Sequence, residues 1–400
     1  MISYETAIQK VLEQATDFGT EEVELHKCNG RVLAEPILAD RDFPPFDRAT
    51  KDGIAIDFKG IKSDGQYFEI SGMAPAGSPQ QKLTDASQCL EVMTGAIMPE
   101  KTDTVVMYEH LEQKGNGFLL QEPVKQGQNI HYKGSDVKQG ETLLLAGTQI
   151  NEAEIGILAS VGKSMVKVKR LPKIAVISTG NELVDIHETP EPHQIRKSNV
   201  HTLRALLGAL QIEADTFHLV DNPSVLKEKL AVILQDYDVL LLSGGVSKGK
   251  FDFLPETFDA LGVEKIFHKV RQRPGKPFWF GRHLETKTTI FSFPGNPVST
   301  FVSYHVYFKP WLNKTLGTAS SQITVFLSVP VQNSTKLTLF VGVTVVLSDG
   351  KLIAKQVTTT GSGDLMALSK ADGFIKIEPA VTAGEKGKSV PLIPTRNLVS

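Results

Sequence analysis

Between residues 173 and 312, apolar segments of strand length alternate with segments of helical periodicity. Strands are expected at 173–180, 213–220, 238–245 and 288–295, and helices at 200–210, 223–235, 255–262 and 298–312. The run from Val239 to Leu242 is apolar without alternation, which is typical of a strand buried on both faces. Strands that alternate with helices predict a doubly wound parallel sheet, and few other folds accommodate such a pattern.

The segments on either side of this region have a different pattern, in which strand-like runs predominate. Short strand-like runs broken by glycine fill residues 46–135, for example at 66–72, 88–95 and 102–110, and strands return at 323–331, 338–348 and 351–358. Helices are expected at 3–16, with Ser3 as its cap, and at 151–162. The predicted fold class is therefore α/β multidomain: a central doubly wound parallel sheet domain, a β-rich inserted domain and a small C-terminal β-barrel-like domain.

Composition limits the setting in which the protein works. A net charge of -2 gives no global attraction to nucleic acid or to an anionic membrane. The two cysteines, Cys28 and Cys89, form neither a disulfide framework nor a ligand cluster, and they suit a reducing compartment. The N-terminus lacks the apolar core of a signal peptide, and no run approaches the roughly 18 apolar residues of a membrane span. We expect a cytoplasmic protein.

Four predicted strands end in small or conformationally special residues. These ends are 178–180, 220–222, 243–245 and 293–297, and they contain Thr179, Gly180, Ser243, Gly244, Gly245, Pro294, Gly295, Asn296 and Pro297, with Ser247 in the loop that follows the third. Ligands of open parallel sheets bind beyond the carboxyl ends of the strands, and glycines let backbone amides approach an anion closely. This edge of the sheet is the predicted ligand site.

Acids and bases occupy the same predicted edge. Glu182, Asp221 and Asp252 follow strand ends, and Arg273 and Lys276 lie in a glycine-containing loop suited to phosphate. A carboxylate about 4 Å from a phosphate charge would cost on the order of 4 kcal/mol at an effective dielectric of 20, so acids that converge on a phosphate site predict a bound metal. Magnesium typically takes one or two carboxylates together with substrate phosphate oxygens. We find no cysteine or Ser–His pair suited to a covalent intermediate.

Each feature also has a structural interpretation. The Gly244–Gly245 pair and the Thr94–Gly95 pair fit simple turns, and residues 294–297 fit a rigid turn before the last helix. Glu182 and Asp221 fit helix caps, and Lys276 fits a solvated loop. The functional interpretation rests on the number of such features expected at one edge of one sheet.

Motifs along almost the whole chain resemble the MoeA family of molybdopterin molybdenumtransferases, which is related to the gephyrin E domain. The matching segments lie at 43–56, 92–99, 134–144, 176–184, 194–199, 240–252, 273–281, 293–299 and 360–377. The resemblance implies an enzyme that inserts molybdenum from molybdate into adenylylated molybdopterin and releases AMP, with Mg²⁺ assisting. It further implies a homodimer that works with molybdopterin adenylyltransferase and with proteins of molybdoenzyme maturation.

The resemblance also implies domains and residue roles. The domains are 1–43 with 137–170 (a split N-terminal domain), 44–136 (the inserted β-rich domain), 171–318 (the molybdopterin-binding sheet domain, like that of molybdopterin adenylyltransferases) and 319–400 (the C-terminal β domain). The implied catalytic residues are Asp52, Thr94, Asp136, Glu182, Asp221, Asp252 and Lys276, with Glu182, Asp221 and Asp252 as metal ligands. Asp52 and Thr94 would act from the neighbouring subunit.

The chain departs from the family pattern at a few positions. Lys51 and Ile54 flank Asp52–Gly53 where the family usually has Met and Tyr, Lys197 replaces a frequent Asp, and Arg273 replaces a common Lys. None of these removes one of the acids named above. Two other functions stay open: an adenylyltransferase or nucleotide pyrophosphatase built on the same sheet, and a non-catalytic scaffold.

Overall fold

The computed structural model describes residues 1–246, 252–318, 322–379 and 387–398. These divide into two compact units: a first unit of residues 1–23, 28–34 and 167–400, and a second unit of residues 24–27 and 35–166. In the described residues no helix is both long enough and apolar enough to span a membrane.

The first unit is built on a six-stranded sheet. Its strand order is β16 (Ala214–Leu219), β13 (Ile174–Thr179), β17 (Val239–Ser243), β21 (Thr289–Phe293), β20 (Trp279–His283) and β18 (Val263–His268). The first four are parallel, which confirms the prediction. β20 and β18 add an antiparallel edge that the sequence pattern did not predict.

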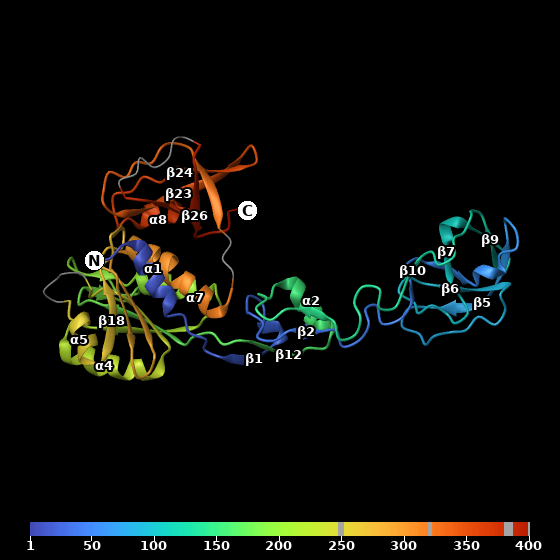
Figure 1. The fold of residues 1–400 in the computed structure, drawn as a ribbon, viewed down its shortest axis with the longest axis horizontal. Coiled ribbons are helices and arrows are strands. Elements are labelled where there is room, and N and C mark those ends of the chain that lie inside the picture. The colour runs from blue at the N-terminus through green and yellow to red at the C-terminus, as the bar shows by residue number, and fades with distance from the viewer. Residues whose placement is uncertain (247–251, 319–321, 380–386, 399–400) are drawn as a thin grey trace. The chain divides into compact units, whose positions relative to one another are not determined.

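Helices cover both faces of this sheet (Figure 1). They are α1 (Tyr4–Glu13), α3 (Asn199–Gly208), α4 (Pro223–Asp236), α5 (Leu254–Ala260), α6 (Pro297–Ser303) and α7 (Lys309–Leu316), with a π-helical turn, Tyr304–Phe308, between the last two. Ser3 caps α1 as predicted, because its Oγ accepts from the amide of Thr6 at 3.1 Å.

Successive strand residues enter two different cores. Val239 and Leu241 pack with α1, α3 and the α6–α7 segment, whereas Leu240 and Leu242 pack with α4 and α5. Burial of each such side chain contributes about 1.5–3 kcal/mol, so both faces hold β17 in place. The strand that carries Ser243 and Gly244 at its end is therefore fixed from both sides.

The C-terminal part of the first unit is a small closed barrel. Its strands are β22 (Ile323–Leu327), β23 (Thr338–Ser348), β24 (Lys351–Gln356), β25 (Gly373–Ile377) and β26 (Ser389–Pro394), and the β23–β25 pairing closes it. Helix α8 (Leu365–Lys370) precedes β25. A two-residue strand, β19 (Gln272–Arg273), leaves the sheet domain and pairs in parallel with β23.

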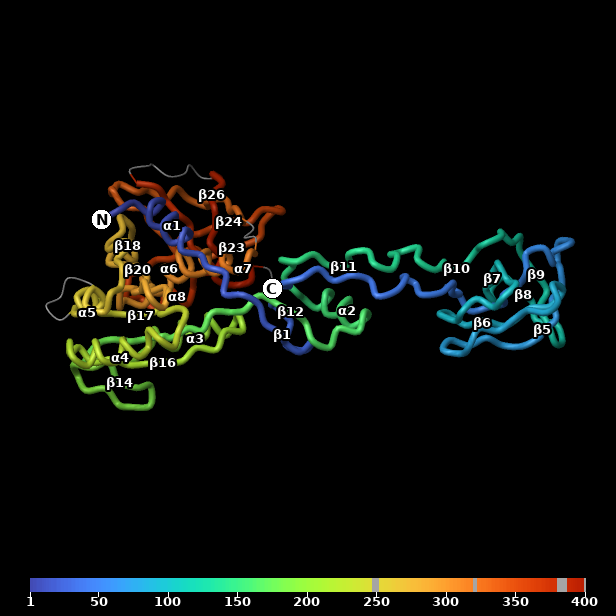
Figure 2. The backbone as a smooth tube through the Cα atoms, turned by 60° about the horizontal axis from the view of Figure 1, so that its bottom comes forward, coloured from blue at the N-terminus to red at the C-terminus, as the bar shows by residue number. Residues whose placement is uncertain are grey.

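The second unit is rich in β structure, as predicted. Its main sheet has the order β7 (Thr104–Met107), β4 (Gly53–Ile56), β6 (Gln88–Val92), β5 (Tyr67–Ala74), β9 (Gly117–Leu120) and β8 (Leu111–Lys114). All of these strands except β4 are labelled in Figure 2. Short pairs join β3 (Arg48–Ala49) to β10 (Ile130–His131) and β2 (Ile37–Leu38) to β11 (Thr142–Leu144). Helix α2 (Glu152–Ser160) carries a capping box at Asn151.

Short elements complete the description. β1 (Thr20–Glu24) forms a two-stranded sheet with β12 (Met165–Lys169), and β14 (Leu183–Val184) pairs in parallel with β15 (Ile195–Arg196). Single 3₁₀ turns lie at Leu25–Lys27, Phe58–Gly60 and Tyr108–His110.

Candidate functional site

The glycines at the end of β17 are required by close packing as well as by backbone conformation. Gly244 has φ +104° and Gly245 has φ +70°. A Cβ on Gly244 would lie 2.7 Å from the carbonyl oxygen of Thr179, and a Cβ on Gly245 would lie 2.7 Å from Cδ1 of Leu254. The neighbouring strand end and the start of α5 therefore leave no room for a side chain here.

A cavity of about 420 Å³ lies at the carboxyl ends of these strands. Its lining includes most of the predicted ligand-binding residues: Thr179, Gly180, Ser243, Gly244, Gly245, Gly295, Asn296 and Pro297. The Thr179 hydroxyl oxygen is buried and has no hydrogen-bond partner among the described residues. The cavity thus has a small, glycine-rich lining that includes a residue whose buried hydroxyl has no partner in the described part of the chain. Ser247 belongs to a loop outside the described residues.

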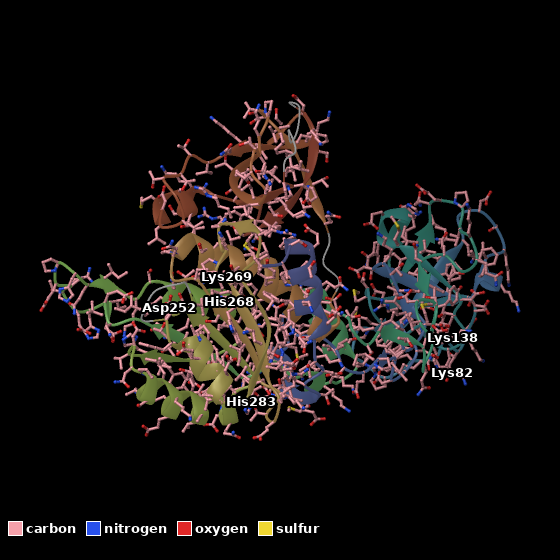
Figure 3. The ribbon with its side chains drawn as sticks, turned by 60° about the vertical axis from the view of Figure 1, so that its left-hand side comes forward. Lys82, Lys138, Asp252, His268, Lys269 and His283 are labelled. Carbon is pink, nitrogen blue, oxygen red and sulfur yellow. The ribbon has the colours of Figure 1, made fainter. Side chains whose placement is uncertain are left out.

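The three predicted acids line the same cavity. The Glu182 carboxylate lies against Gly180, where a Cβ would come within 2.6 Å of Oε2. Burial is the main cause that raises the pKa of Asp221, and the charges of Glu182 and Asp252 raise that pKa further. Asp252 precedes α5 and is labelled in Figure 3. Electrostatic repulsion among these carboxylates favours a cation or a proton in the cavity.

The arrangement suits Mg²⁺ only in part. Carboxylate oxygens are the donors that Mg²⁺ prefers, and Asp221 is already destabilised as an anion. In the parts of the chain that the structure describes, however, no three His, Cys, Asp or Glu side chains are grouped closely enough to hold a metal. The residues fit a Mg²⁺ held by one or two acids together with phosphate oxygens of a ligand, and they do not form a complete protein cage.

The helix-cap interpretation of the acids is wrong. Asn222 caps α4, because its Oδ1 accepts from the amides of Ser224 at 3.0 Å and Val225 at 3.2 Å. Asp221 uses its backbone amide to bond Asn181 Oδ1 at 3.1 Å. Glu182 is followed by β14, so no helix begins beside it. The turn interpretation of residues 294–297 agrees with the structure in that Pro297 begins α6.

Sequence reasoning missed Asn199, which joins two of the strand ends. Its Nδ2 donates to Ser243 Oγ and to the carbonyl oxygen of Gly295, both at 2.7 Å. Asn199 is the first residue of α3 and lines the cavity. One sequence signal could have identified Asn199: it is a polar residue at the start of a helix that follows a predicted strand end. Its two acceptors depend on how β17 and the 293–297 turn approach each other in space.

Lys197 also lines the cavity. Its Nζ lies 2.9 Å from Asp185 Oδ2, and its side chain is only 13% exposed. The departure from the family pattern at this position therefore places a partly buried, positively charged side chain at the cavity wall. Its partner comes from the same β14–β15 segment, which keeps the lysine ordered.

A Ser–His pair lies at the strand ends, and the sequence pattern did not reveal it. Ser178 Oγ lies 3.1 Å from Nδ1 of His218, on the neighbouring strand β16, and Ser178 lines the cavity. The two residues are far apart in the sequence and lie side by side only because β13 and β16 pair in parallel in this register. Ser178 is 3% exposed and also reaches the carbonyl oxygen of Phe217 at 3.4 Å, so its hydroxyl is engaged within the sheet.

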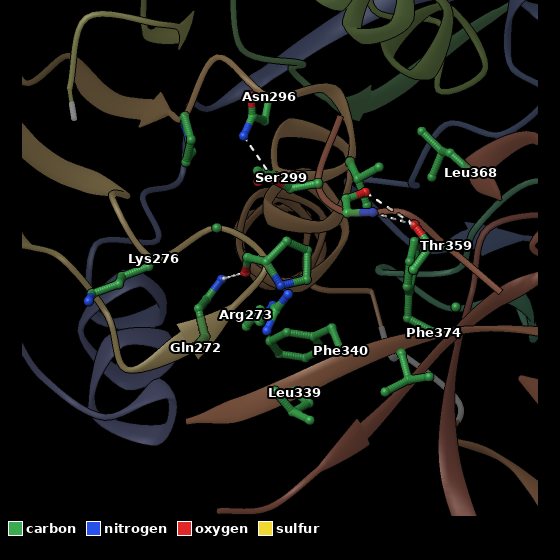
Figure 4. A pocket seen from close by; sticks show the side chains of 18 of the residues that line it. Gln272, Arg273, Lys276, Asn296, Ser299, Leu339, Phe340, Thr359, Leu368 and Phe374 are labelled. Atoms are coloured by element: carbon green, nitrogen blue, oxygen red, sulfur yellow. Dashed lines mark hydrogen bonds between the residues drawn. The ribbon is translucent and has the colours of Figure 1, made fainter. Parts of the chain in front are cut away.

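The predicted basic loop borders a second cavity of about 610 Å³, which the sheet domain shares with the barrel (Figure 4). Arg273, Lys276 and Pro294 line one side, and Phe340, Phe374 and other apolar barrel residues line the other. Pairing of Arg273 with Leu339 fixes the loop against β23. Gly245, Gly295 and Asn296 line both cavities, so the two are neighbours.

Asn296 connects the strand end to the barrel. Its Nδ2 donates to Ser362 Oγ at 2.8 Å, and the amide of Val298 donates to the carbonyl oxygen of Ser362 at 3.0 Å. Both contacts hold the segment around Ser362 at the start of α6. The barrel therefore contributes a fixed wall to the second cavity.

The remaining predicted catalytic residues lie in the second unit. Asp52 Oδ1 accepts from the amide of Thr94 at 2.6 Å and from its hydroxyl at 2.8 Å, and these bonds lower the pKa of Asp52. The turn interpretation of Thr94–Gly95 is therefore incomplete, because the turn binds a carboxylate. Asp136 lies 2.7 Å from His131, through Oδ1 and Nε2.

Comparisons with known proteins match almost the whole chain. Family models match at residues 2–162 (MoeA N-terminal region, domain I and II), 175–314 (probable molybdopterin binding domain) and 324–395 (MoeA C-terminal region, domain IV). A molybdopterin molybdenumtransferase of Synechocystis sp. is 36% identical over 395 residues, which cover 98% of this chain and 99% of the relative. One from Staphylococcus epidermidis is 30% identical over 408 residues, covering 99% and 96%.

A solved structure agrees with these matches. The crystal structure of the molybdopterin biosynthesis MoeA protein from Pyrococcus horikosii has a TM-score of 0.82 and 28% sequence identity, and covers 98% of this chain and 99% of that one. A doubly wound sheet with an acid-lined cavity at its carboxyl edge, carried with a β-rich unit and a small barrel, defines a multidomain protein of the molybdopterin-binding class. The chain belongs to the MoeA family, as its motifs predicted.

Proposed function

We propose that this chain is a molybdopterin molybdenumtransferase, which inserts molybdenum from molybdate into adenylylated molybdopterin and releases AMP. The observation that carries the proposal is the cavity at the sheet edge, where a glycine-rich backbone and three acids lie together in a chain of the MoeA family. The curated relatives that match it over nearly their full length bear this name.

The described residues suggest a division of roles. Gly244 and Gly245 offer backbone close to the ligand phosphates, and Arg273 and Lys276 supply positive charge to phosphate or to the oxyanion substrate. One or two of the acids Asp221, Asp252 and Glu182, together with phosphate oxygens of the ligand, would hold Mg²⁺, which when bound would neutralise and polarise the pyrophosphate. Thr179 and Asn199 orient the ligand and the cavity floor through their hydroxyl and amide groups.

The direct test is turnover. Purified protein is mixed with adenylylated molybdopterin, molybdate and Mg²⁺, and AMP is followed by chromatography. We expect AMP together with a product that activates a molybdenum-free molybdoenzyme. Adenylylated product formed from ATP would support the adenylyltransferase instead, and tight binding of a protein partner without turnover would support the scaffold.

Lys276→Ala should weaken binding of adenylylated molybdopterin by about tenfold, the effect of losing one charged contact of roughly 1.4 kcal/mol. The salt dependence of binding should also become shallower, because exposed charges are screened by salt. Titrations at low and high KCl measure both. Lys227→Ala, at an exposed site on α4, is the matched control. Unchanged affinity and salt slope for Lys276→Ala would leave this loop as a solvated turn.

The proposal includes a homodimer in which Asp52 and Thr94 complete the site of the partner subunit. It also includes the four-domain division at 1–43 with 137–170, 44–136, 171–318 and 319–400, a cytoplasmic location, and upstream and downstream partners in cofactor synthesis and molybdoenzyme maturation. Support comes from family membership and from the distribution of the proposed residues over both units. Symmetric pairing is the commonest form of oligomer.

Mixing two inactive variants tests the dimer directly. If sites are completed between subunits, Asp52→Asn and Asp252→Asn chains should restore activity when combined, because each mixed dimer contains one intact site. Random pairing gives about one quarter of the wild-type site number for closed dimers. Light scattering should give the mass of two chains for each variant. A monomer, or no restoration in a verified mixed dimer, would contradict the proposal.

A further inference from the structure

Three side chains of the second unit form a hydrogen-bonded series that ends on Asp136. Strands β3 and β10 are antiparallel and place Arg48 opposite His131. Arg48 Nη2 lies 3.1 Å from His131 Nδ1, and His131 Nε2 lies 2.7 Å from Asp136 Oδ1. The imidazole therefore lies between a guanidinium group and a carboxylate. Arg48 lies within the family-like segment 43–56, but neither Arg48 nor His131 was among the predicted site residues.

The chemistry of the three groups fixes the tautomer of the histidine. A guanidinium group only donates hydrogen bonds, so Nδ1 of His131 must accept from Arg48. The proton of the neutral imidazole is then on Nε2, from which it is donated to Asp136. Arg48 thereby selects the histidine tautomer that can hold the carboxylate.

Asp136 needs such a partner because its side chain is 54% exposed. The loop backbone is anchored, since the amide of Asp136 donates to the carbonyl oxygen of Phe43 at 3.0 Å. The carboxylate itself has one other contact, a long one of 3.4 Å from Ser135 Oγ, also to Oδ1. Among the described residues Oδ2 receives no hydrogen bond, so the contact with His131 orders the group and leaves one oxygen for a ligand.

We propose that His131, oriented by Arg48, is a positioning residue that holds Asp136 in one rotamer with Oδ2 available to the reaction. The inference rests on the proposed function for the part that Asp136 takes in turnover. A residue that positions an acid should affect the rate constant of the reaction more than substrate binding. It should also be replaceable by a side chain that donates from the same place.

Kinetics of substituted proteins test the proposal. His131→Ala should lower kcat for AMP release by about 10- to 100-fold, the range seen when the partner of a site carboxylate or histidine is removed, with KM within about threefold. His131→Gln, whose amide nitrogen can replace Nε2, should recover most of kcat. A merely structural role predicts a loss that follows the melting temperature and that Gln does not rescue. Full kcat in His131→Ala, beside an inactive Asp136→Ala, would overturn the proposal.

A spectroscopic measurement tests the same geometry without turnover. In protein labelled with ¹⁵N-histidine, the His131 signals, assigned by their loss in His131→Ala, should show the Nε2–H tautomer at neutral pH. Arg48→Ala should convert them to a tautomer mixture, and Arg48→Lys, which keeps a donor, should not. An Nδ1–H tautomer in the wild type would overturn the proposal. If the wild type showed no transferase activity, this result would still decide whether His131 donates to Asp136, so the two failures are distinguishable.

Discussion

Asp221→Asn is expected to lower molybdenum insertion on the order of 100-fold or more, the effect of removing one group that stabilises developing charge, without weakening the fold. Its melting temperature at pH 8 should be equal to that of the wild type or higher by about 1–2 °C. The reason is that burial and the charges of Glu182 and Asp252 raise the pKa of Asp221 in the folded protein. A site residue whose ionised form is destabilised in this way is retained for its function and lowers the stability of the folded protein.

The sign of the pH dependence follows from the same shift. Because the folded pKa lies above the unfolded pKa, folding favours the protonated carboxyl, and the ionised group destabilises the protein above its folded pKa. This penalty disappears below the unfolded pKa, near pH 4. The difference in melting temperature between Asp221→Asn and wild type should therefore shrink as the pH falls from about 8 towards about 4.

Scanning calorimetry across this pH range and an AMP assay on the same samples provide the measurements. Asp259→Asn, at an exposed site on α5, is the matched control and should change neither activity nor the pH dependence of stability. Addition of Mg²⁺ with ligand should stabilise the wild type more than Asp221→Asn. If Asp221→Asn kept more than half of the activity, or melted several degrees lower at pH 8, its proposed role would be wrong.

The sheet and its edge were predictable because they depend on local sequence. Uninterrupted apolar runs such as Val239–Leu242 identify buried parallel strands, and parallel strands deliver their carboxyl ends to one edge. The positions of Thr179, Gly244 and Asp221 around one cavity follow from that rule. The antiparallel strands β18 and β20 were missed because no helix separates them and the alternating pattern does not apply.

Contacts between distant segments could not be predicted. The two-residue strand β19 exists only because Arg273 meets Leu339 of the barrel, a pairing that neither local sequence specifies. Asn199 bonds to acceptors on two segments that lie far from it in the chain. His131 lies beside Arg48 because β3 and β10, which are distant in sequence, pair in that register. Family resemblance supplied positions such as Asp136, whereas the groups that orient them are visible only in three dimensions.

AMP release is expected to require both molybdate and a divalent ion. The described residues that line the cavity at the sheet edge offer backbone amides, carboxylates, hydroxyls and two basic side chains, Arg196 and Lys197, with no cysteine among them. The one Ser–His pair there, Ser178 with His218, is buried in the sheet and shares its hydroxyl with a backbone carbonyl. Without a covalent nucleophile, cleavage depends on charge neutralisation at the pyrophosphate and on an oxygen nucleophile held beside it.

In the proposed reaction that oxygen comes from molybdate or from a water molecule next to it. It attacks the phosphorus of the AMP moiety, the pyrophosphate bond breaks, and the leaving phosphate stays on molybdopterin. Attack by water gives AMP directly, whereas attack by a molybdate oxygen gives adenylyl molybdate, which water then hydrolyses to AMP and molybdate. Coupling of this cleavage to molybdate binding prevents loss of the activated ligand to simple hydrolysis. Omission of either molybdate or Mg²⁺ should therefore lower the rate of AMP release by about 100-fold, since each removes a group that positions or neutralises the reacting oxygens.

The experiment follows AMP in single-turnover mixtures of protein with adenylylated molybdopterin, omitting molybdate, Mg²⁺ or both. Ser178→Ala is the matched variant and should release AMP within about threefold of the wild type, because a substitution away from the reacting groups changes transition-state stabilisation little. Collapse of the rate in Ser178→Ala at unchanged stability would instead indicate a covalent adenylyl intermediate on that hydroxyl. Rapid AMP release without molybdate would contradict the coupling and would support the pyrophosphatase.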